Sequence, residues 1–136
     1  LVTWYRAPLD AQRMHEAAQA LLGEQDFSAF RAASCQSSTA MRHLHEIAVC
    51  RKDHYVVIDI TANAFLHHMV RNIAGSLMAV GSGAKPVHWR AELLAGRNRA
   101  VAADTAPADG LYLSRVEYPA EFGLSRGATG PTILTL

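Results

Sequence analysis

The chain has 136 residues, of which 50% are apolar and 18% are charged, and its 13 Lys and Arg nearly balance its 12 Asp and Glu. Intrinsic disorder requires low hydrophobicity and high net charge, so this composition excludes a disordered protein. The chain has no run of about 18 apolar residues, which excludes a membrane-spanning helix, and its length fits one domain.

The start of the chain and its cysteines indicate its compartment. Leu1–Arg6 has neither the basic lead nor the apolar core of a signal peptide. The chain also starts without Met, so we expect it to be a piece of a longer chain. Cys35 and Cys50 form no C-x-x-C pair. Without an export signal, we expect two reduced thiols in a cytoplasmic protein.

The near-zero net charge conceals an uneven distribution. Residues 31–100 carry nine Lys and Arg against four Asp and Glu, whereas residues 1–30 and 101–136 are each net acidic by two charges. Arg outnumbers Lys by 11 to 2. Arg contacts phosphates through two parallel hydrogen bonds and stacks on bases, so the bias is compatible with RNA binding. A solvated basic face and a codon bias toward Arg explain it too, and charge alone favours that explanation.

A helix is predicted from Asp10 to about Leu22, with Gly23 ending it. Its apolar residues recur with the spacing of one buried helix face: Met14, Ala17, Ala18, Leu21 and Leu22. Asp26 then predicts a short capped turn anchored by Phe27 and Phe30, and the small polar residues 32–40 predict a loop.

Two strands are predicted next, joined by a turn at residues 51–54. The second strand, residues 55–61, is rich in β-branched residues that alternate, and the short gap favours an antiparallel hairpin. In the first strand, strict alternation predicts one face made of His43, His45, Ile47 and Val49. It predicts the opposite face to consist of Leu44, Ala48 and Cys50.

Asn63 predicts the cap of a helix from Ala64 to about Val80, ended by the glycines that follow. The expected buried stripe is Leu66, Val70, Ile73 and Leu77, with Phe65 and Met69 beside it.

The last third of the chain predicts three further elements and a tail. We expect a helix over residues 86–96, a short helical piece over 100–104, a strand over 111–118 and a tail over 119–136. Helices and strands are mixed without strict βαβ alternation. The sequence therefore predicts an α+β fold in which helices pack on one face of an antiparallel sheet.

The histidine and cysteine residues do not form a recognisable metal or nucleophile site. His67 and His68 are adjacent, so on a helix their side chains point about 100° apart. Arg71 occupies the position at which a zinc-binding helix would carry its second His. We therefore expect no metal site and interpret both His residues as core or interface residues. Nothing in the sequence pairs Cys35 with a His, so we interpret it as a packing residue.

The segment from Asn63 to Gly75 is the most informative part of the chain. His67 and Arg71 are four residues apart, so on a helix they share a face. Arg71 lies two turns into the expected helix, beside the apolar stripe. An Arg there either pairs with a carboxylate at the rim of a cleft or is an ordinary surface residue, and the spacing leaves both readings open.

Several segments, taken in order, resemble one family: Leu9–Asp10, Met14, Gly23, Asp26–Arg31, Asn63–Gly75 and Gly110–Leu113. The chain resembles the C-terminal half of the bacterial tRNA pseudouridine synthase A (TruA) family, whose members are about twice as long as this chain. The resemblance runs from about Pro8 to Tyr118. It implies that residues 1–136 are a C-terminal domain, half of a pseudouridine-synthase fold, and that the N-terminal catalytic half lies outside them.

The resemblance also implies an activity. Family members are homodimers that isomerise uridine to pseudouridine at positions 38–40 of the tRNA anticodon stem-loop, without a cofactor. A basic residue that pairs with the catalytic Asp aligns with Arg71, and a Leu that packs against the target base aligns with Leu111. We expect Phe65 and His67 to contact the substrate as well. We expect three residues to contact RNA: Arg31, Arg42 and His68.

This sequence departs from the family pattern in one respect. The family's Asp lies in an Arg-Thr-Asp-x-Gly motif in the N-terminal half, together with an aromatic Tyr. Six Asp occur here, and none follows Arg-Thr. We therefore expect residues 1–136 alone to lack synthase activity. A stand-alone RNA-binding or dimerisation module remains the alternative, with an unrelated metabolic enzyme as a weaker third, and the reading frame upstream of Leu1 discriminates between the first two.

Overall fold

The computed structural model describes residues 5, 7–30, 41–66, 68–88 and 106–113. The chain divides into two compact units, one formed by residues 4–107 and the other by residues 1–3 with 108–136. All the helices and strands described below belong to the first unit.

In the second unit, the described residues form a turn in which the Leu111 amide donates to the Ala108 carbonyl over 3.1 Å. Residues 111–113 are not part of a strand, contrary to the prediction. The rest of the predicted strand and the tail lie outside the described residues.

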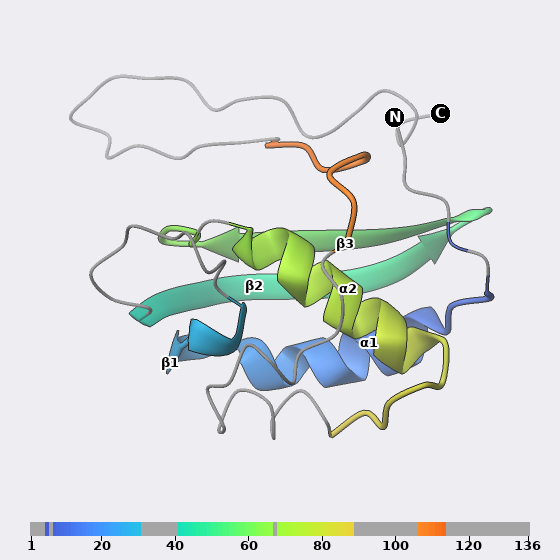
Figure 1. Ribbon diagram of the computed structural model, residues 1–136, viewed down its shortest axis with the longest axis horizontal. Helices are drawn as coiled ribbons and strands as arrows, with labels where there is room; N and C mark the ends of the chain where they lie inside the picture. The colour runs from blue at the N-terminus through green and yellow to red at the C-terminus, as the bar shows by residue number, and fades with distance from the viewer. Residues whose placement is uncertain (1–4, 6, 31–40, 67, 89–105, 114–136) are drawn as a thin grey trace. The chain divides into compact units, whose positions relative to one another are not determined.

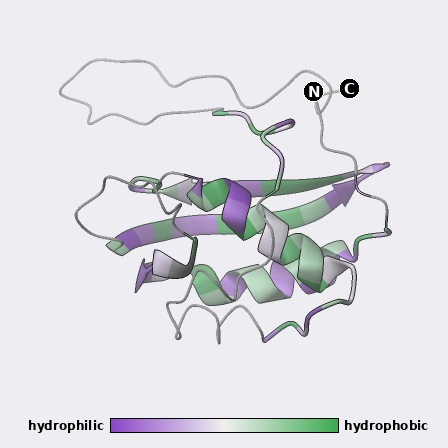
Figure 2. Cartoon of the chain, in the orientation of Figure 1, coloured by the Kyte–Doolittle hydropathy of each residue, from purple (hydrophilic) through white to green (hydrophobic). Residues whose placement is uncertain are grey.

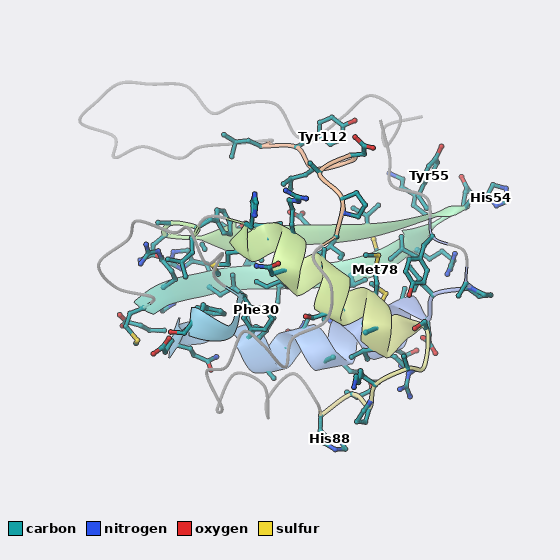
Figure 3. All side chains as sticks on the ribbon, in the orientation of Figure 1. Phe30, His54, Tyr55, Met78, His88 and Tyr112 are labelled. Atoms are coloured by element: carbon teal, nitrogen blue, oxygen red, sulfur yellow. The ribbon has the colours of Figure 1, made fainter. Side chains whose placement is uncertain are left out.

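The first unit is built on a three-stranded antiparallel sheet of order β1-β2-β3 (Figure 1). The strands are β1 (Gly23–Asp26), β2 (Met41–Lys52) and β3 (Tyr55–Ala62). The predicted hairpin is confirmed. Lys52 pairs with Tyr55 across a two-residue turn, in which Asp53 has a φ of 55°, a conformation that Asp tolerates. Figure 3 shows His54 and Tyr55 at the tip of this hairpin.

Strand β1 was not predicted from the sequence. Its four residues are Gly, Glu, Gln and Asp, which have low β propensity. Pairing with the first half of β2 supplies the strand conformation instead. The predicted role of Asp26 as a cap is confirmed, because its carboxylate accepts hydrogen bonds from both the amide and the hydroxyl of Ser28, at the start of a 3-10 turn, η2 (Ser28–Phe30).

The predicted faces of β2 are wrong in its first half, because the strand contains a β-bulge. Leu44 pairs with Ala62 while Glu46 pairs with Thr61, so His45 is an extra residue. One extra residue reverses the alternation, and Leu44 is buried together with Ile47 and Val49. His43 and His45 therefore do not share the core face. Their rings lie 4.6 Å apart, and His45 is exposed.

Two helices, α1 (Ala11–Ala18) and α2 (Met69–Gly81), accompany the sheet; in Figure 1, α2 crosses in front of the strands and α1 is drawn below them. Figure 2 shows apolar residues alternating with polar ones along the strands. The α+β architecture with helices on one sheet face is confirmed. The core consists of these buried apolar residues: Met14, Ala17, Ala18, Leu21, Phe27, Phe30, Leu44, Ile47, Val49, Leu66, Met69, Ile73, Leu77 and Val80.

Helix α1 begins as predicted, with the Asp10 carboxylate accepting a hydrogen bond from the Arg13 amide over 3.1 Å. Its end differs from the prediction. The α-helix stops at Ala18, and a 3-10 turn, η1 (Gln19–Leu21), follows. Because Leu22 is extended, with a ψ of 149°, its side chain leaves the buried face and is 37% exposed.

Helix α2 begins five residues later than predicted, at Met69, and Asn63 is not its cap. Asn63 instead binds His43 twice: its side-chain oxygen accepts from the His43 amide over 2.9 Å, and its own amide donates to the His43 carbonyl over 3.0 Å. Asn63 therefore closes the end of the sheet. The helix ends as predicted at Gly81, and Gly83 has a φ of 87°.

The later start of α2 changes which of its residues are buried. Met69, Ile73, Leu77 and Val80 form the apolar part of the buried face. Val70, predicted to be buried, is only half-buried, and Phe65 precedes the helix and is 39% exposed. Asn72 and Ser76 are the polar residues on the buried face.

Several other predictions concern residues that are described only in part. Residues 86–88 do not start a helix, since residues 87 and 88 form a turn, and the rest of that predicted helix lies outside the described residues. The helical piece at 100–104, the loop at 32–40 and Cys35 also lie outside them. Cys50 is a free, exposed thiol. None of the helices in the described residues is long and apolar enough to cross a membrane.

Candidate active site

The candidate site lies at the first turn of helix α2, where the chain enters the helix by an unusual route. The Met69 amide donates to the Leu66 carbonyl and the Asn72 amide to the His68 carbonyl, both over 2.9 Å. Between them His68 has a φ of 61° and a ψ of 7°, in the left-handed region. Buried Leu66 and Met69 anchor this entry in the core, so the position of the first helical turn is set by packing.

Arg71 is the third residue of α2, in its first turn rather than two turns into a helix as predicted. Its side chain is half-buried. The guanidinium Nε donates to the carbonyl of Ala106 over 2.8 Å, and the amide of Ala106 donates to the Arg71 carbonyl over 3.1 Å. Ala106 is 7% exposed and thus fixes both the backbone and the side chain of Arg71.

A second contact of the Arg71 guanidinium is with His68. Nη1 lies 3.2 Å from the His68 Nε2. Because a guanidinium has only donors, Nε2 must accept this hydrogen bond, and a neutral His68 ring must carry its proton on Nδ1. The two contacts occupy Nε and Nη1 of the guanidinium, while the described residues provide no hydrogen bond to Nη2.

The electrostatic surroundings of Arg71 favour an anion as its partner. The N-terminus of a helix carries a partial positive charge, so a cation in the first turn is disfavoured unless it is paired. Helix α2 has no acidic residue in its first turn, and no carboxylate among the described residues pairs with Arg71. A carboxylate or a phosphate would complement both the helix end and the Nη2 donor.

Asn72, which the sequence analysis did not single out, connects this turn to a distant segment. Its side chain is 1% exposed, and its amide nitrogen donates to the carbonyl of Phe30 over 2.6 Å. Phe30, labelled in Figure 3, ends the 3-10 turn η2 beside α2. The sequence did carry a signal for Asn72: it stands three positions after Met69 and four before Ser76, a spacing that places a polar residue on the buried helix face. Nothing in the sequence indicated the contact with Ala106.

Of the predicted site residues, the structure brings His68 and Arg71 together. Helix α2 begins at Met69. The expected pairing of His67 with Arg71 lies outside the described residues, because His67 is not among them. Phe65 is exposed, in the segment that precedes α2.

The other predicted residues make no described hydrogen bond to Arg71, or they lie outside the described residues. Leu111 belongs to the second unit and is 49% exposed. Arg42 is half-buried on β2, where its Nη1 donates to the Met41 carbonyl over 2.7 Å. Arg31 lies outside the described residues. Among the residues that the structure does describe, no three His, Cys, Asp or Glu gather as metal ligands.

Comparison with known proteins identifies the family. The family model described as tRNA pseudouridine synthase matches residues 17–119, which include Arg71 and its contacts. This chain belongs to the tRNA pseudouridine synthase family. The resemblance inferred from the sequence motifs is thereby confirmed.

Individual relatives of the chain agree with the family match. It is 57% identical over 133 residues to tRNA pseudouridine synthase A of Haemophilus ducreyi, covering 98% of this chain and 51% of that protein. It is 58% identical, again over 98% of its length, to the proteins of the same name from Cronobacter sakazakii and Actinobacillus succinogenes, of which it covers 49% and 50%. The chain thus spans about half the length of the curated relatives it matches.

Proposed function

We propose that this chain is the C-terminal half of a tRNA pseudouridine synthase, and that the complete enzyme converts uridine to pseudouridine at positions 38–40 of the anticodon stem-loop. The reaction detaches the base from the ribose and rejoins it through carbon 5, which requires no cofactor. The base must first leave its stack, at a cost of a few kcal/mol. The family match and the half-length coverage of the relatives support this proposal.

Among the individual residues, Arg71 gives the main support for the proposal. It is a half-buried guanidinium held at two of its three nitrogens, at the positive end of a helix, without a carboxylate partner among the described residues. We propose that the catalytic Asp of the other half pairs with its free edge. Such a pair keeps a carboxylate ionised by lowering its pKa, and holds it in one orientation.

Further parts of the proposal rest on the resemblance and on the charge distribution. Leu111 packs against the target base, with Phe65 and His67 contacting the substrate. The basic residues within 31–100, Arg31 and Arg42 among them, contact the RNA backbone. The complete enzyme is a cytoplasmic homodimer.

The experiment compares Arg71→Ala with wild type in the complete enzyme, measuring tritium release from carbon 5 of labelled uridine in tRNA. Removing one partner of a buried ion pair costs about 3–5 kcal/mol. We therefore expect kcat to fall by at least about 100-fold, with tRNA binding nearly unchanged. The isolated chain of residues 1–136 should be inactive.

Arg13→Ala is the matched control. Arg13 also donates from its guanidinium to two backbone carbonyls, of Val80 and Lys85, but at the opposite end of α2. This variant should lose some stability and keep its kcat. Activity of Arg71→Ala within threefold of wild type would refute the proposed role of Arg71. Pseudouridine formation by the isolated chain would refute the placement of the catalytic Asp in the other half.

A further inference from the structure

The backbone conformation of His68 is costly and brings no capping benefit. Residues that cap a helix N-terminus are normally extended and accept a hydrogen bond with their side chain. His68 has a φ of 61° and makes no such bond. Left-handed non-glycine residues are uncommon, although His is enriched among them, and they are over-represented at functional sites. The conformation therefore calls for a reason other than helix capping.

The reason lies in what the conformation does with the imidazole. It brings Nε2 to 3.2 Å from Nη1 of Arg71, three residues further along the chain. Both side chains are half-buried. The ring accepts this hydrogen bond only in its neutral form with the proton on Nδ1, so the contact selects one tautomer as well as one rotamer.

Together with Ala106, the imidazole defines the plane of the guanidinium. The Ala106 carbonyl holds Nε at 2.8 Å, and His68 holds Nη1. A planar, rigid fork held at two nitrogens has no freedom to rotate about its last torsion angle. The nitrogen that remains, Nη2, is then directed at a fixed point.

We propose that His68 is a positioning residue: its neutral imidazole orients Arg71 for the catalytic carboxylate. This inference rests on the proposed function, because it concerns the same guanidinium. It replaces the RNA-binding role that the sequence suggested for His68. The residue acts through Arg71 and touches neither the substrate nor the reacting atoms.

A pair of variants isolates the hydrogen-bond acceptor. His68→Gln and His68→Met have side chains of nearly equal length without β-branching, so both pay the same cost for the left-handed backbone. Only the Gln amide oxygen accepts a hydrogen bond from Arg71. In the complete enzyme we expect His68→Met to lower kcat about tenfold with KM within twofold, and His68→Gln to stay within threefold of wild type.

Two further variants test whether the loss of activity comes from the missing hydrogen-bond acceptor. The first removes backbone strain at position 68, and the second detects effects that do not pass through Arg71. His68→Gly removes the cost of the left-handed conformation but offers no acceptor, so it should be as stable as wild type and as slow as His68→Met. In an Arg71→Ala background, His68→Met should cause no additional loss, because its effect passes through Arg71.

The outcomes distinguish this inference from the proposed function. If Arg71→Ala abolishes activity while His68→Met and His68→Gln behave alike, the positioning role is wrong and the proposed function stands. If Arg71→Ala is fully active, the proposed role of Arg71 is wrong. Nitrogen NMR gives a readout that does not depend on activity: the His68 ring should carry its proton on Nδ1, and a proton on Nε2 would overturn the inference.

Discussion

Gly81, at the end of α2, lies against Met14 of α1, and replacing it with Ala tests this packing. A Cβ at position 81 would lie 2.6 Å from Sδ and 2.7 Å from Cγ of Met14, and 3.3 Å from Cδ2 of Leu9. Carbon atoms at their optimum lie about 3.5–4.0 Å apart, so Met14 must move by about 1 Å. The Asp10 amide also donates to the Gly81 carbonyl over 2.9 Å, which limits separation of the two segments.

The expected cost follows from these distances. Overpacking a core costs about 1–3 kcal/mol, and the flexible Met14 side chain places this case in the lower half of that range. Replacing Gly by Ala in a helix interior gains up to about 1 kcal/mol, but Gly81 is the last residue of α2 and gains less. We therefore expect Gly81→Ala to lower the free energy of unfolding by about 1 kcal/mol.

Denaturant unfolding of the protein, followed by circular dichroism, measures this change. A double-mutant cycle with Met14→Ala identifies its origin. Met14→Ala alone should destabilise the core by about 2–5 kcal/mol. In the Met14→Ala background, Gly81→Ala should become neutral or stabilising, because the Met14 atoms that clash with the new Cβ are gone. Additive effects of the two changes, or a Gly81→Ala variant as stable as wild type, would refute the reasoning.

Two smaller predictions concern polar groups of the same unit. The buried Ser76 hydroxyl has no hydrogen-bond partner among the residues that the structure describes, so Ser76→Ala should raise the free energy of unfolding by about 1 kcal/mol. Ser82→Ala, the control, removes a hydroxyl bonded to the Ala79 carbonyl and should bring no gain. Asn63→Ala removes the acceptor for the His43 amide and should cost about 1 kcal/mol. Asn63→Asp keeps the acceptor and should restore most of that loss; equal unfolding midpoints for the two Asn63 variants would contradict the assignment.

The elements that the sequence predicted well are those whose signal is local. The Asp10 cap, the start of α1 and the β3 alternation depend on neighbours within one or two turns or strand positions. The family resemblance also rests on contiguous motifs, which remain recognisable whatever the exact helix boundaries. Arg71 was singled out within such a motif, and the family model covers it.

Two of the errors have one cause in common, which is competition from a distant partner. Asn63 is a good helix cap by its local pattern, but it binds His43, twenty residues earlier, and α2 starts later. The bulge at His45 reverses the faces of β2, because burying Leu44 beside Ile47 is worth more than strict alternation. Neither the contact of Asn63 with His43 nor the bulge at His45 can be predicted from the residues that are adjacent in sequence.

The sequence by itself determined the fold class and the family, because both depend on the pattern or chemistry of contiguous residues, and it singled out Arg71 within one such pattern. Only the tertiary structure decided how that cation is held. The carbonyl that binds Arg71 belongs to Ala106, 35 residues away, and the imidazole that accepts from it depends on a left-handed backbone at His68. Backbone carbonyls are the same in every residue, so the sequence carries no signal for which of them meets a guanidinium.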